Sequence, residues 1–217
     1  MSQREYEQYA DAALQSRLEI ATNRLAEEFD GVYDRETIEN SIQESARSLS
    51  PKGVTPYVHI LAERFTRERL RAQAQTEQRI EKTVPEVFFV SLTGGGRAQM
   101  AAALLASRVG DAVSVHCAGS DAGDEIDDNV QAAMGEIGID LDDAFVRPVT
   151  SEVLAAADVV VTMGRSVGDV EIPASARHED WRVGDPAGAD LEETRRVRDD
   201  IARRIDALAH ELSGPNQ

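Results

Sequence analysis

The pattern of hydrophobic and polar positions divides this 217-residue chain into two regions. Over residues 1–78, apolar residues recur at spacings of three and four, which is typical of helices that bury one face. From Val84 onward, short apolar runs alternate with helix-like stretches, and this alternation is typical of an α/β domain. We therefore predict an all-α domain over residues 1–78 and an α/β domain over residues 84–217.

Three helices are expected in the first region, and Asp34 and Thr55-Pro56 are suited to begin the second and third. Their short connections predict an antiparallel three-helix bundle. Because such a bundle has a small core, we expect a homodimer formed through residues 1–78; a monomeric helical cap on the second domain is the alternative. The apolar positions are Leu14, Leu18, Ala21, Leu25 and Phe29, then Ile38, Ile42, Ala46 and Leu49, then Val58, Leu61 and Phe65.

The second region is expected to form a small, parallel, doubly wound sheet. In such sheets, ligands bind at the carboxyl ends of the strands. Ser91, Met163 and Asp185 follow strands or lie near strand ends, so they can converge at one site. The expected strands are 87–90, 113–118, 159–162 and a short one near 178–181, and the expected helices lie near 98–108, 128–137 and 191–212.

A glycine-rich loop joins the first strand to the helix after it, and it reads Ser91-Leu92-Thr93-Gly94-Gly95-Gly96-Arg97. Backbone N–H groups and the start of a helix attract anions, and an arginine adds a planar fork for oxyanion oxygens. The loop lacks the Lys-Ser or Lys-Thr pair that follows the last glycine of a Walker loop, and it lacks the third glycine of a dinucleotide fingerprint. We therefore expect the 92–97 backbone and Arg97 to bind an oxyanion; glycines that serve turn geometry alone are the alternative.

The loop resembles the Cys-x5-Arg loop of the low-molecular-weight protein tyrosine phosphatase and arsenate reductase family. Ser91 stands at the position of the family's nucleophilic cysteine, and Arg97 at that of its arginine. Asp185-Pro186 resembles the family's general-acid loop, so the resemblance implies Ser91, Arg97 and Asp185 as the catalytic positions. It covers roughly Val84 to Leu212. Residues 1–78 more loosely resemble the three-helix dimerisation domain found ahead of some phosphatase-like proteins.

The sequence departs from that family where the chemistry is most demanding. A serine hydroxyl stays protonated and is a poor nucleophile unless a base lies beside it. Gly94 replaces the family's asparagine, a mild change because both residues tolerate positive φ, and Ala98 replaces a serine that bonds the nucleophile. The cysteines of a thiol relay are missing from residues 163–171, and Cys117, the single cysteine, is expected to be buried and structural.

Binding without turnover is therefore the expected function. The expected ligands are phosphate, arsenate or a sulfate-like anion, or a phosphorylated small molecule or protein. Two explanations of Ser91 stay open: a natural chain that lost its thiolate, or an active protein tyrosine phosphatase carrying a Cys-to-Ser change. Thiol-relay arsenate reduction is not supported.

Composition limits the expected partners and the expected cellular compartment. The net charge of −17 argues against nucleic acid as a partner, and no apolar run is long enough to span a membrane. The acidic, lysine-poor sequence, with only Lys52 and Lys82, indicates a salt-rich cytoplasm, although high genomic GC content also favours arginine. A single cysteine fits a reducing cytoplasm. No metal or other cofactor is expected, because the histidines lack the spacing of metal ligands.

Overall fold

The chain folds into two compact units, Met1–Glu81 and Lys82–Gln217, in a computed structural model. The structure describes residues 3–49, 57–120, 126–164 and 170–213, with side chains from residue 12 onward. Within these residues, no helix combines the length and apolar character that a bilayer crossing needs. Each unit is described below by itself.

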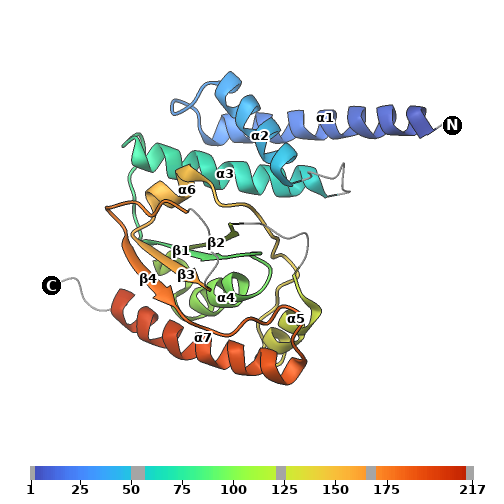
Figure 1. The fold of residues 1–217 in the computed structure, drawn as a ribbon. Coiled ribbons are helices and arrows are strands. Elements are labelled where there is room, and N and C mark those ends of the chain that lie inside the picture. Colours follow the sequence, from blue (N-terminus) through green and yellow to red (C-terminus); the bar gives the residue numbers. More distant parts are fainter. Residues whose placement is uncertain (1–2, 50–56, 121–125, 165–169, 214–217) are drawn as a thin grey trace. The chain divides into compact units, whose positions relative to one another are not determined.

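The first unit is helical, with α1 at Gln3–Glu28, α2 at Arg35–Leu49 and α3 at Val58–Thr76 (Figure 1). Asp34 caps α2 as expected, because its Oδ1 accepts a hydrogen bond of 2.8 Å from the Thr37 backbone N–H. Thr55-Pro56, the expected start of α3, lies outside the described residues. The buried core contains seven of the predicted positions together with Ala62 and Leu70: Leu18, Ala21, Leu25, Phe29, Ile38, Ile42 and Ala46. Of the other predicted positions, Val58 and Phe65 are buried outside this cluster, whereas Leu14, Leu49 and Leu61 are only partly buried.

The second unit is built on a four-stranded sheet in the order β2-β1-β3-β4, and every pair of neighbouring strands is parallel. The strands are β1 (Glu86–Ser91), β2 (Ser114–Gly119), β3 (Val159–Met163) and β4 (Arg177–Trp181). This order confirms the predicted parallel α/β fold. The carboxyl ends of β1, β2 and β3 lie side by side, since Ser91 lies opposite Gly119 of β2 on one side and Met163 of β3 on the other.

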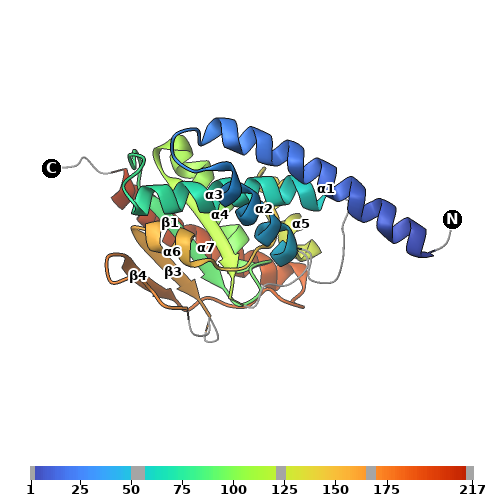
Figure 2. The same cartoon turned by 90° about the horizontal axis from the view of Figure 1, so that it is seen from above.

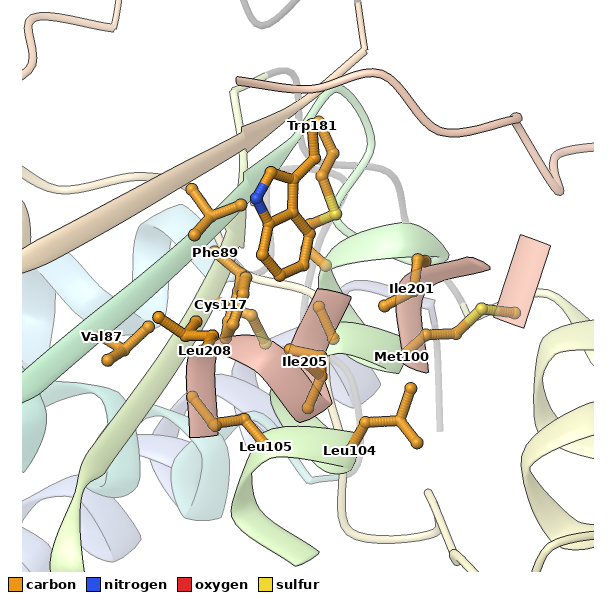
Figure 3. Close-up of a cluster of buried hydrophobic side chains, with 14 of the residues drawn as sticks. Val87, Phe89, Met100, Leu104, Leu105, Cys117, Trp181, Ile201, Ile205 and Leu208 are labelled. Atoms are coloured by element: carbon orange, nitrogen blue, oxygen red, sulfur yellow. The ribbon is translucent and has the colours of Figure 1, made fainter. Parts of the chain in front are cut away.

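Helices α4 (Arg97–Val109) and α7 (Leu191–Leu212) cover one face of the sheet, and the short α6 (Ser151–Ala156) lies on the other (Figures 1 and 2). Figure 3 shows the core between the sheet and these two long helices, where Phe89 and Trp181 pack with their ring centroids 5.9 Å apart. Cys117 projects from β2 into this cluster and is 6% exposed. The prediction of a buried structural cysteine is therefore confirmed.

Helix α5 (Asp128–Gly135) is attached to α7 by hydrogen bonds. Arg198 Nη1 donates to the Ala133 carbonyl over 2.7 Å, and the Arg195 guanidinium pairs with Glu136. The Arg195 hydrogen bonds hold the pKa of Glu136 below its usual value. A carboxylate whose pKa is lowered in the folded state stabilises the fold at pH values where it is ionised. This contribution is therefore present at neutral pH and is lost as the pH falls and Glu136 is protonated.

Two short elements were not expected from the sequence, the 3-10 turn η1 (Gly110–Ala112) and helix α6. A six-residue helix is too short to show a helical period, so packing defines α6: Val153, Leu154 and Ala156 are all buried. The expected helix near 128–137 also ends earlier, at Gly135.

Candidate functional site

The glycine-rich loop lies at the carboxyl edge of the sheet, as the topology requires. It leaves β1 at Ser91 and enters α4 at Arg97. Gly96 occupies the N-cap position of α4 and has no side chain that could bond the first N–H groups of the helix. Those donors and the positive end of the helix dipole therefore face the loop, which suits an anion.

Gly94 is required by its surroundings as well as by its backbone angle. Its φ is +74°, and a Cβ built on it would come within 2.6 Å of the Gly119 backbone nitrogen at the end of β2. Real Cβ atoms essentially never come this close, and a backbone atom cannot rotate away as a side chain can. The expectation that asparagine and glycine are nearly interchangeable here is therefore wrong for this chain.

Gly94→Ala should destabilise the second unit more than Gly138→Ala does. Both glycines have nearly the same φ, +74° and +75°, but nothing lies within 4 Å of a Cβ at position 138. The control should lose about 1–2 kcal/mol for the left-handed backbone, and Gly94→Ala should lose more because of the contact with Gly119. Urea unfolding followed by the fluorescence of Trp181, the single tryptophan, measures both; equal losses would contradict the contact argument.

Arg97 is held from two sides. Its side chain is 9% exposed, and its Nη2 lies 2.9 Å from Asp185 Oδ2. On the other side, a Cβ at Gly164 would come within 2.7 Å of Arg97 Nη1, so the guanidinium packs directly against this bare glycine. The fork is thus fixed beside the loop before any ligand arrives, which reduces the entropy lost on binding.

Ser91 is buried at the end of β1, with 2% of its surface exposed. Its Oγ has no hydrogen-bond partner among the described residues. Its carbonyl accepts a 3.0 Å hydrogen bond from the Ser120 N–H, which fixes the backbone at the carboxyl end of β1. A buried hydroxyl without a partner is costly, and a ligand oxygen in the loop could supply one.

A cavity of about 350 Å³ brings most of the predicted site residues together. Ser91, Thr93, Gly95, Gly96, Arg97 and Asp185 line it, whereas Leu92 and Gly94 do not. The loop after Asp185 closes one side, because Gly96 approaches Pro186 so closely that a Cβ would lie 2.9 Å from the ring. A second cavity of about 600 Å³ adjoins the same ion pair, with Asp180 and Arg182 in its wall.

Three further residues belong to the site, and the sequence did not single them out. Gly164 supports Arg97, and Asp127 and Asp128 line the cavity from the start of α5. The signal for the two acids was their place at a helix start after a strand, where ligands of parallel sheets bind. No group of three or more histidine, cysteine or carboxylate side chains within the described part of the chain is placed to hold a metal ion.

Comparison with known proteins agrees with this geometry. Residues 86–217 match the model of the low molecular weight phosphotyrosine protein phosphatase family. The chain belongs to this family. Residues 18–74 match the N-terminal domain described as protein-tyrosine-phosphatase-like, so both regions have relatives among phosphatase-like proteins.

Among the most similar members of the family are arsenate reductases. The solved thioredoxin-dependent arsenate reductase of Corynebacterium glutamicum is 34% identical, with a TM-score of 0.79 over 90% of this chain and 95% of its own. An arsenate reductase of Brevibacillus brevis is 35% identical over 57% of this chain and 92% of its own length. An arsenate reductase solved in its phosphate-binding state superposes with a TM-score of 0.54 over 60% of this chain, at 27% identity.

Proposed function

We propose that this chain binds tetrahedral oxyanions, or phosphomonoesters, in the loop from Ser91 to Arg97 and turns them over slowly or not at all. The observation that carries the proposal is the buried Ser91 hydroxyl, which has no partner within the described residues and shares a cavity with the buried Arg97. The hydroxyl, the loop amides and the guanidinium together offer donors on several sides of one anion.

Arsenate and phosphate are the oxyanions that the relatives favour, since similar proteins are arsenate reductases and one was solved in a phosphate-binding state. The two ions share shape and charge, so one loop can bind both. Sulfate has the same tetrahedral shape and carries two negative charges at neutral pH, so it is expected to bind in the same loop. We therefore expect phosphate and arsenate to compete for one site.

Thiolate chemistry is what this chain lacks. The resemblance to the family implies a cysteine at the position of Ser91, whereas the single cysteine of this chain, Cys117, is buried in the core on β2. Asp185, the expected general acid, is paired with Arg97 and would have to leave it to protonate a substrate. An active phosphatase with a Cys-to-Ser change at Ser91 is the second candidate, and the Asp185-Pro186 loop beside the cavity favours it.

The proposal is tested by titrating the full chain with phosphate and then with arsenate in a calorimeter, and by assaying the same sample for hydrolysis of an aryl phosphate. We expect one saturable site per chain, competition between the two ions and no detectable hydrolysis. Saturable binding with rapid hydrolysis would contradict the proposed loss of turnover, and no binding would exclude both candidates.

Homodimerisation through residues 1–78 is the second part of the proposal. Besides the small core of the bundle, three large apolar side chains are exposed among the described residues of the first unit: Ile20 at 51%, Tyr57 at 69% and Ile60 at 47%. We expect light scattering of the full chain at micromolar concentration to give the mass of a dimer, and residues 84–217 alone to give that of a monomer. A monomeric full chain would refute this part.

A further inference from the structure

The cavity beside the glycine-rich loop is larger than one tetrahedral ion requires. Its volume of about 350 Å³ lies in the range of about 300–1,000 Å³ that is typical of sites for whole organic ligands. Beyond the loop, its wall includes Ile126, Pro186 and Ala187, which are apolar, and the start of α5. The space can therefore hold an oxyanion together with the organic group that bears it.

The charges around the cavity are distributed unevenly. Arg97 is the one cation among the described residues that line it, against three carboxylates, those of Asp127, Asp128 and Asp185. Arg97 and Asp185 already form an ion pair at 2.9 Å. Asp127 and Asp128 therefore leave an excess of negative charge that would attract a cation.

The same cavity contains an independent sign of a ligand. The Ser91 side chain lines it, is 2% exposed and has an Oγ without a hydrogen-bond partner within the described residues. This hydroxyl lies at the loop end of the cavity, and the two carboxylates lie on the α5 side. The cavity thus combines donors for an oxyanion, from the loop and Arg97, with acceptors for a cation, from the start of α5.

The Asp127 carboxylate is fixed in place by the fold. Asp127 caps α5, since its Oδ1 accepts a 2.8 Å hydrogen bond from the Asn129 N–H. The Asn129 side chain in turn donates to the Ala189 carbonyl over 2.9 Å, which joins the start of α5 to the loop that follows Asp185. The acidic end of the cavity therefore keeps its place relative to Arg97.

We propose that this cavity binds a phosphomonoester whose alcohol carries a positive charge, such as a phosphorylated quaternary amino alcohol. The phosphoryl group lies against the loop and Arg97, and the cationic group lies against Asp127 and Asp128. This inference rests on the proposed function, because it places the phosphoryl group in the same loop. Beyond the proposed function, the positive charge on the organic part of the ligand contributes to which phosphomonoester the cavity binds most tightly.

The test compares phosphocholine with 3,3-dimethylbutyl phosphate, which has the same shape but carbon in place of the charged nitrogen. Calorimetry with the full chain at fixed ionic strength should show phosphocholine binding about 3- to 10-fold more tightly, as for two partly exposed ion pairs. Asp127→Asn/Asp128→Asn should bring the two affinities together, because asparagine still caps α5 but carries no charge. Asp30→Asn/Asp111→Asn removes the same charge from exposed positions elsewhere and should keep the preference.

Equal affinities in the unmodified chain would overturn this inference, and so would an equal loss of preference in both double variants, since net charge would then be the cause. Asp128→Asn alone repeats the test without altering the helix cap, and it should reduce the preference in part. Arg97→Ala separates this inference from the proposed function. If the unmodified chain binds the two compounds equally and Arg97→Ala weakens the binding of both, the proposed function stands and only the cationic class of ligand fails. If Arg97→Ala weakens the binding of neither compound, the loop is not the site.

Discussion

Ser91→Cys is expected to convert a chain with negligible phosphatase activity into a slow phosphatase. A cysteine at this position would line the same cavity as Arg97, the first residue of α4, and an arginine and a helix start lower the pKa of a thiol and yield the nucleophilic thiolate. The serine hydroxyl cannot ionise there, and it has no hydrogen-bonded base within the described residues. Steady-state hydrolysis of an aryl phosphate across a pH range measures the gain.

The recovered rate should be partial for two reasons that the structure supplies. Ala98 is fully buried and offers no hydroxyl to the nucleophile, and Asp185 is paired with Arg97. Ser91→Cys/Asp185→Asn should be about 100-fold slower than Ser91→Cys or slower still, as for a lost general acid. Equal rates for these two variants would mean that Asp185 is structural. Turnover by the unmodified chain would contradict the account of Ser91, and a rate typical of the family in Ser91→Cys would favour an ordinary phosphatase changed at one position.

Arg97→Ala is expected to weaken phosphate binding by about 1.5–3 kcal/mol, which is more than tenfold, because a charge-assisted bond to the anion is lost. The phosphate affinity of Arg97→Lys should fall between that of the unmodified chain and that of Arg97→Ala, since an ammonium keeps the charge but not the planar fork. The matched control is Arg108→Ala, which removes the same charge from the last turn of the same helix. Calorimetric titration with phosphate compares all four proteins, and an Arg97→Ala affinity equal to that of Arg108→Ala would defeat the assignment.

Much of the fold could be predicted because its signals are local. The run Val87–Val90, bounded by a polar stretch and a glycine-rich loop, reads as a buried strand, and the structure has it as the core of β1. The expected helix near 191–212 is α7, and Asp190 caps it, since its side chain accepts a 2.9 Å hydrogen bond from the Glu193 N–H. Helix α6 was not predicted, because six residues are too few to show a helical period of hydrophobic positions. Only its buried side chains define it.

The candidate site was predictable in its loop and in Asp185, but the contacts that join these residues to their surroundings were not. Ser91 and Arg97 belong to one contiguous motif, whereas the Arg97–Asp185 pair joins residues that lie far apart in the sequence. The steric demand on Gly94 comes from Gly119, on another strand, so its conformational freedom alone gave the wrong expectation for asparagine. Contacts of this kind depend on strand order and loop closure, which a local pattern does not contain.

The most direct test of the central claim is an NMR titration of the isotope-labelled full chain with inorganic phosphate, which follows the backbone amides of Leu92 to Gly96. We expect these amide signals and the side-chain Nε–H of Arg97 to shift together and saturably, with one affinity, and arsenate to reproduce the pattern. Amides at the control turn around Gly138 should stay unchanged. Unshifted loop amides at saturating phosphate, or shifts spread over the whole surface, would contradict the claim that this loop is an oxyanion site.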